Sequence, residues 1–176
     1  MTRWAWNSST RIHPRREGRT KGQVGKKGKS NGRWIVGIKF CPLLNGAGRI
    51  VDWDVEAANV HDGEFQRMLA DYDEAKMTDK GFHRSRKRGG DCANLLVCER
   101  GQCNVRKTSL LVRMIIETVF SNWVSVWSMK KVGDRKWPGI EARLAFACAA
   151  WNLVTDWATR LFGGDRASLS TAWVPL

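Results

Sequence analysis

Two neighbouring segments of the chain alternate apolar and polar positions with a period of two residues. Residues 33–44 and 49–57 both follow this pattern, and the glycine-rich stretch "NGAG" lies between them. Alternation around a short glycine-containing turn predicts a β-hairpin whose strands each have one buried face. The alternating apolar positions are Trp34, Val36, Ile38 and Phe40 in the first strand and Val51, Trp53 and Val55 in the second.

Helical spacing replaces this alternation further along the chain. The segment "HDGEFQRMLADYDEA" places apolar residues three and four apart, with Asp62 near its start as the expected N-cap. The segment "AKMTDKGF" then predicts a short strand that ends at a glycine, and two helices are expected over residues 109–129 and from Ile140 onward. The apolar positions of the last helix are Ile140, Leu144, Ala147, Cys148, Trp151, Val154 and Leu161.

The remaining segments have no apolar period. Residues 1–32 are rich in glycine and basic residues and predict a basic arm that is partly irregular, whereas residues 83–107 predict a basic surface loop. We therefore expect one core domain over residues 33–162 and a tail over residues 163–176. A chain of 176 residues with 43% hydrophobic content can bury one such core.

Charge narrows the choice of partner. Thirty Lys and Arg against 17 Asp and Glu give a formal net charge of +13, which favours a polyanion such as nucleic acid. The N-terminus lacks a signal-peptide pattern and no apolar run is long enough to span a bilayer, so no membrane role is expected. The five cysteines form no CxxC pair and are expected to be reduced structural thiols.

One carboxylate lies within the most apolar helix. In "RMIIETVFSNW", Arg113, Glu117 and Ser121 are spaced by four and form a narrow polar stripe. The apolar residues around them predict a helix that is buried on most sides, where an unpaired carboxylate would cost several kcal/mol. Either Arg113 neutralises Glu117 as a structural ion pair, or the stripe faces a binding site.

The order of the predicted elements favours a site. Strand, turn, strand, helix, short strand and helix follow one another as in the ribonuclease-H-like α/β fold after its first strand. Carboxylates in that fold converge to hold two divalent ions, and such a metal pair suits phosphodiester chemistry. Four blocks of this sequence, "GKKGKSNGRWIVGIKFCPLLNGAGRIVDWDVEAANVHD", "TDKGFH", "RMIIETVFSNW" and "RLAFACAAWNL", resemble in the same order the DDE-type transposases of bacterial insertion sequences.

This resemblance implies specific roles. Asp79 in "TDKGF" would be the second catalytic carboxylate and Glu117 the last, both as ligands of Mg²⁺ or Mn²⁺, with 37 residues between them. The resemblance also implies metal-dependent DNA cleavage and strand transfer at the ends of an insertion sequence. It implies a cytoplasmic, nucleoid-associated prokaryotic protein, for which a homodimer is one possible assembly. The expected DNA contacts are Arg15, Arg16, Arg19, Lys26, Lys27, Lys29, Arg84, Arg86, Lys87, Arg88, Arg113 and Lys130.

One part of the family pattern is missing. The family carries a first catalytic Asp on a first strand, but no Asp precedes Asp52, and the neutral Asn7 occupies that neighbourhood. We therefore expect an N-terminally truncated or inactive copy whose first strand is lost. Asp52 and Asp54 are not expected to replace the missing Asp, because the alternation of polar and apolar residues in their strand already explains them. The alternatives are a non-catalytic basic nucleic-acid-binding protein and a remnant that does not fold stably. His61 and His83 lack ligand-spaced partners, Asp62 is expected to be a helix cap, and Trp34 is expected to be a core residue.

Overall fold

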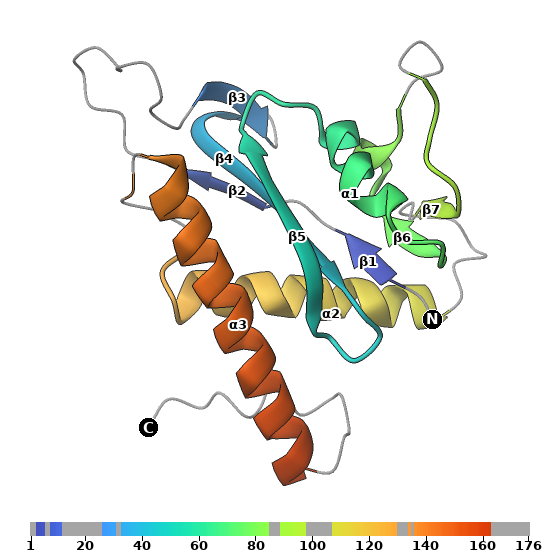
Figure 1. Cartoon of the computed structure of the whole chain (residues 1–176), viewed down its shortest axis with the longest axis vertical. Helices are drawn as coiled ribbons and strands as arrows, with labels where there is room; N and C mark the ends of the chain where they lie inside the picture. The colour runs from blue at the N-terminus through green and yellow to red at the C-terminus, as the bar shows by residue number, and fades with distance from the viewer. Residues whose placement is uncertain are drawn as a thin grey trace.

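The structure is a computed structural model and describes residues 3–5, 8–11, 26–30, 33–84, 89–97, 107–129, 134 and 136–162. These residues form one mixed sheet with helices on both of its faces (Figure 1). The strands are β1 (Arg3–Ala5), β2 (Ser8–Arg11), β3 (Lys26–Ser30), β4 (Arg33–Leu44), β5 (Ile50–Ala57), β6 (Lys76–Thr78) and β7 (Leu95–Val97). The helices are the 3₁₀ turns η1 (Asp62–Phe65) and η2 (Lys80–Phe82) and the α-helices α1 (Gln66–Ala70), α2 (Lys107–Ser125) and α3 (Trp137–Phe162).

Strand β4 organises the sheet. It pairs antiparallel with β5 along one edge and with β1 and β2 along the other edge. Leu43 and Leu44 show this directly, since each has one Cα partner in β5 and another in β1. β1 then pairs in parallel with β6, and β6 in parallel with β7. Across the sheet, β5 is therefore followed by β4, and β4 by β1 and β2, which share its other edge. β6 lies next to β1, and β7 lies next to β6.

The N-terminal residues supply the middle of this sheet. β1 places Ala5 opposite Leu43, and β2 places Ser8 opposite Phe40, so both strands follow the same register along β4. The expectation that the first strand is lost is therefore wrong. Short polar segments such as "SSTR" form strands here because β4 offers a long row of backbone partners on this edge.

A hairpin was also missed in the segment that was expected to be an irregular arm. β3 pairs antiparallel with the first half of β4, from Lys26 opposite Gly37 to Ser30 opposite Arg33. Only Asn31 and Gly32 separate the two strands, and Asn-Gly is the strongest sequence signal for a two-residue hairpin turn. The division of the chain into arm, core and tail stays a prediction.

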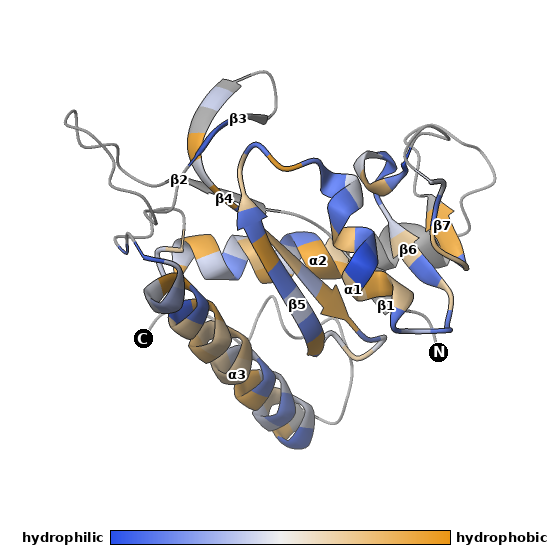
Figure 2. Cartoon of the chain, turned by 45° about the horizontal axis from the view of Figure 1, so that its top comes forward, coloured by the Kyte–Doolittle hydropathy of each residue, from blue (hydrophilic) through white to orange (hydrophobic). Residues whose placement is uncertain are grey.

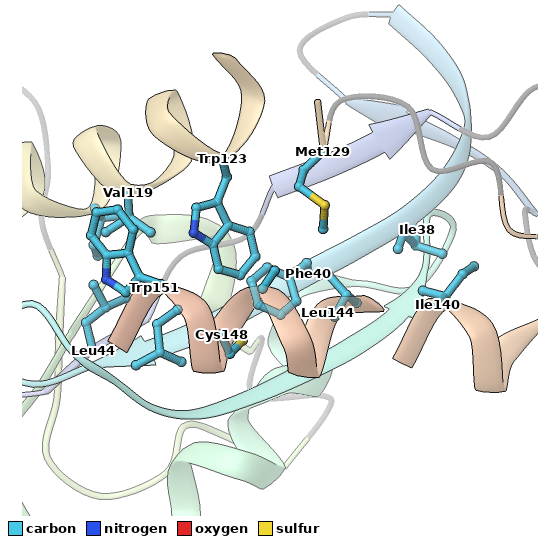
Figure 3. Close-up of a cluster of buried hydrophobic side chains, with 13 residues drawn as sticks. Ile38, Phe40, Leu44, Val119, Trp123, Met129, Ile140, Leu144, Cys148 and Trp151 are labelled. Atoms are coloured by element: carbon cyan, nitrogen blue, oxygen red, sulfur yellow. The ribbon is translucent and has the colours of Figure 1, made fainter. Parts of the chain in front are cut away.

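The two faces of β4 enter two different cores. Ile38 and Phe40 pack against α2 and α3, whereas Cys41 and Leu43 pack against α1 and η2. Figure 3 shows the first core, where side chains from α2 and α3 gather around Phe40. The Phe40 and Trp123 rings stack there with their centroids 5.1 Å apart. β4 is thus buried on both faces, which explains its long apolar sequence.

Strand β5 alternates as predicted, and Figure 2 shows the apolar and polar bands along it. Trp53 and Val55 pack against the core formed with α2 and α3. Asp52, Asp54 and Glu56 face the opposite side, toward α1. The predicted hairpin of residues 33–44 and 49–57 is therefore confirmed.

The predicted helical segments are also confirmed, as η1 with α1 and as α2 and α3. The short strand is confirmed as β6, but it ends at Thr78 and not at the glycine, because Lys80–Phe82 form the turn η2. β7 was not predicted, because three residues give too short a window for a period to emerge. Trp34, expected in the core, is 64% exposed, and Leu161 is exposed as well. None of the helices in the described part of the chain is long and apolar enough to cross a bilayer.

Candidate active site and DNA-facing surface

Asp79 lies directly after β6, at the end of a strand in the interior of the sheet. Its carboxylate caps η2 by accepting a hydrogen bond of 2.8 Å from the backbone N–H of Lys80. Phe82, at the end of η2, is buried against Phe65 and anchors this turn. The block "TDKGF" therefore fixes the Asp79 backbone through a cap on one side and a buried ring on the other.

The glycine of this block lies close to a neighbouring carboxylate. A Cβ on Gly81 would lie 2.9 Å from Oδ2 of Asp62. Asp62 is itself held by Lys39 of β4, whose Nζ donates to Asp62 Oδ1 over 2.6 Å and to the carbonyl oxygen of Val60 over 2.7 Å. Asp62 thus links β4 to the Asp79 turn. Its predicted role as a helix cap is wrong, since His61 caps η1 by accepting from the N–H of Gly63.

The register of β1 brings the N-terminal segment close to Asp79. In the parallel pair Ala5 lies opposite Thr78, and Asp79 follows Thr78 directly. Trp6 and Asn7 follow Ala5 in the sequence and lie outside the described residues. The strand that precedes Asn7 and the strand that precedes Asp79 are therefore neighbours that run in the same direction.

Glu117 lies on the exposed side of α2. Ile116, Val119 and Trp123 face the core, while Glu117 and Ser121 are exposed. Met114 is 61% exposed and Val124 is exposed too, so the prediction of a helix buried on most sides is wrong. The desolvation cost that argued for a buried Arg113–Glu117 pair does not apply at an exposed position. The side chain of Arg113 lies outside the described residues.

No three His, Cys, Asp or Glu side chains within the described residues gather closely enough to hold a metal ion. Asp79 and Glu117 come from different elements, β6 and α2, as the resemblance implies. For a pair of divalent ions these two carboxylates are an incomplete donor set.

The carboxylates of β5 are engaged in structural contacts. Arg67 of α1 bonds Oδ2 of Asp54 over 3.0 Å and also pairs with Glu56, and Tyr72 donates to Asp52. The hydrogen bonds to Asp54 and Glu56 raise the pKa of Arg67. These contacts favour the sequence interpretation that Asp52 and Asp54 do not replace the missing carboxylate.

Arg84, predicted as a DNA contact, belongs to the network that holds the loop after η2. Its Nε donates to the carbonyl oxygen of Gly63 over 2.7 Å, and its guanidinium lies 3.2 Å from a carboxylate oxygen of Glu64. Asp91 accepts from the Arg84 N–H and from Gln66, and its Oδ2 lies 2.6 Å from Nδ1 of His83. This network ties Arg84 and His83 to the fold.

Two of the predicted DNA contacts lie on the β3–β4 hairpin. Lys26 and Lys27 are exposed, and Lys27 Nζ lies 4.8 Å from the ring centroid of Trp34. Lys29 belongs to β3, but its side chain is outside the described residues. The other predicted contacts outside them are Arg15, Arg16, Arg19, Arg86, Lys87, Arg88 and Lys130.

The described cysteines behave as expected. Cys41, Cys92 and Cys148 form no disulfide, and the first and last are buried. Burial raises the pKa of Cys148 to about 12, so this thiol stays protonated in the folded chain.

Comparison with known proteins decides the family. Residues 9–153 match the family described as Transposase DDE domain. The chain belongs to this family. The comparison with curated proteins found no match, and neither did the comparison with solved structures. The resemblance inferred from the sequence blocks is therefore confirmed.

Membership of the transposase DDE domain family supports a function in transposition and makes DNA the expected partner. The domain's relatives generally use divalent metals. The residues that sequence reasoning missed in this transposase domain are Lys39, which holds Asp62, and Trp34 on the hairpin. No sequence signal indicated the role of Lys39. Its contact with Asp62 joins residues 23 positions apart and arises only from the fold.

Proposed function

We propose that this chain is the ribonuclease-H-like catalytic core of an insertion-sequence transposase that binds the ends of its element but cleaves DNA poorly by itself. The observation that carries the proposal is the position of Asp79. It follows β6, which pairs in parallel with β1, and β1 is flanked on its other side by the β4–β5 hairpin. This arrangement supports the fold that the family match implies.

In this proposal Asp79 and Glu117 are the two remaining metal-ligating carboxylates. Two carboxylates and a DNA phosphate oxygen suit one Mg²⁺ or Mn²⁺, because such ions bind through few protein ligands together with substrate phosphates. Bound there, the ion would supply charge neutralisation at the phosphate. A second ion would need a further carboxylate, for which the neutral Asn7 is a poor substitute. The chain's basic residues bind and orient the phosphate backbone.

Metal-linked DNA binding tests this proposal. Duplex affinity is measured by fluorescence anisotropy with and without Mn²⁺, for the wild type and for Glu117→Gln. The proposal predicts that Mn²⁺ tightens binding by the wild type about tenfold, because the dication offsets the repulsion between the carboxylates and the DNA phosphates, and that Glu117→Gln abolishes the gain. Glu141→Gln, an exposed glutamate on α3, is the matched control and should keep it.

A non-catalytic basic DNA-binding protein would behave differently. It would bind duplex in a salt-dependent manner, but Mn²⁺ would change the affinity of wild type and Glu117→Gln alike. That result would overturn the metal role of Glu117. Failure of the wild type to bind any duplex at moderate salt would overturn the proposed function as a whole.

A further inference from the structure

We propose that the β3–β4 hairpin binds an unpaired nucleotide of the DNA, with its base stacked on Trp34 and its phosphate paired with Lys27. The inference rests on the proposed function only in taking DNA as the partner. It adds a specific contact and a specific form of DNA, one in which a base has left the double-helical stack.

The register of the hairpin brings the two side chains together. Lys29 lies directly opposite Trp34 and Val36 directly opposite Lys27, so Lys27 and Trp34 are diagonal neighbours on one face of the ribbon. Diagonal neighbours in an antiparallel pair are within reach of long side chains. The Lys27 ammonium lies 4.8 Å from the Trp34 ring centroid, which is a cation–π contact.

The exposure of Trp34 sets it apart on its strand. Phe40, the other aromatic residue of β4, is almost fully buried, whereas Trp34 is 64% exposed. The hairpin lies at the top of the views in Figures 1 and 2, beyond the helices that cover the rest of β4. An exposed indole beside an ammonium therefore lies on a part of the sheet that no helix of the described residues covers.

The opposite face of the hairpin is fixed to the sheet. A Cβ on Gly28 would lie 2.0 Å from the carbonyl oxygen of Ala58, so the backbone of β3 packs directly on the residue that follows β5. Only glycine permits this approach. The close packing holds one face of β3 against the protein and directs the face with Lys27 and Trp34 outward.

The chemistry of this pair matches one nucleotide. A base offers an aromatic face to the indole, and its phosphate offers an anion to the ammonium. Bases within a duplex cover each other's faces, so an indole can stack only at an end, a frayed pair or an extruded base. The net charge of +13 favours such a polyanion over an apolar protein partner.

Affinities for two DNAs test the inference. One probe is a fully paired, hairpin-capped duplex, and the other is the same duplex with an unpaired overhang that carries 2-aminopurine. We expect the wild type to prefer the overhang and to quench the 2-aminopurine fluorescence by stacking. Trp34→Ala should lose about tenfold in affinity for the overhang and little for the capped duplex, while Trp34→Phe should retain most of the preference.

Trp157→Ala is the matched control, because Trp157 is equally exposed but lies on α3. Its preference and quenching should equal those of the wild type. Equal affinity of the wild type for both probes, or unchanged quenching in Trp34→Ala, would overturn the inference while leaving the proposed function intact. Absence of binding to both probes would overturn both.

Discussion

Asp91 shows how one side chain can stabilise an otherwise irregular basic loop. Burial disfavours its charged form, but hydrogen bonds from Gln66, from the Arg84 N–H and from His83 outweigh that effect and lower its pKa. Gln66 is 3% exposed and also bonds the carbonyl oxygen of Phe82 and the N–H of Cys92. The loop that begins beside Asp79 is therefore anchored from beneath by α1.

The lowered pKa of Asp91 predicts a pH dependence of stability. The folded state favours the carboxylate, so its contribution is present above the unfolded pKa of about 3.9 and is lost as pH falls through the lower folded pKa. Asp91→Asn should cost about 1 kcal/mol of unfolding free energy at neutral pH, with the partly exposed position limiting the effect. The difference between wild type and variant should shrink on acidification, as measured by denaturant unfolding. A difference that is constant with pH would contradict the assigned hydrogen bonds.

Single residues also mark the limit of what the sequence predicts. The block around Asp79 was recognisable because a strand, a cap and a glycine follow one another locally. Lys39 and Trp34 were not, since their environments depend on which strands pair and where the helices end. Alternation placed Trp34 with Ile38 and Phe40, but it could not show that the helices leave this end of β4 uncovered.

Among the elements, α3 is joined to the hairpin by side chains that bond strand backbone. Asn152 accepts from the N–H of Ile50 and donates to its carbonyl oxygen, each over 2.8 Å, and Trp151 Nε1 donates to the carbonyl oxygen of Gly48 over 2.9 Å. Asn152 thereby satisfies both backbone groups of Ile50, as a neighbouring strand would. This contact fixes α3 across the outer strand of the sheet.

Replacing Asn152 by Leu should therefore destabilise the fold. The variant keeps the branched shape of the side chain but leaves two backbone groups of the buried Ile50 without these partners, which should cost about 2–3 kcal/mol. Urea unfolding followed by circular dichroism measures the loss. Leu153→Ala, at an exposed position next in the sequence, is the control and should cost less than about 0.5 kcal/mol. Equal stability of the two variants would contradict the role of Asn152.

The elements that the sequence predicted are those with their own periodic pattern, namely β4, β5, α1, α2 and α3, together with the short strand β6. β1, β2 and β3 were missed because their residues are few and largely polar, and they form strands only where β4 supplies backbone partners. The "SNGR" turn signal could have revealed β3. No local pattern could have revealed that the N-terminal residues enter the middle of the sheet.

On the scale of the whole molecule, the chain combines a strong positive charge with a transposase DDE domain, and the first 51 residues of the chain contain no Asp. The family match covers residues 9–153, and no Asp precedes Asp52. β1 and β6 are parallel neighbours, and Ala5 at the end of β1 lies opposite Thr78, which directly precedes Asp79.

The most direct test of this account is Mn²⁺-dependent nicking of a supercoiled plasmid by Asn7→Asp, compared with the wild type and with Asn7→Asp combined with Glu117→Gln. We predict that Asn7→Asp nicks at least about tenfold faster than the wild type, because it completes the carboxylate set, and that the second substitution abolishes the gain. Thermal unfolding of all three proteins confirms that each is folded. A folded Asn7→Asp variant that nicks no faster than the wild type would contradict the account.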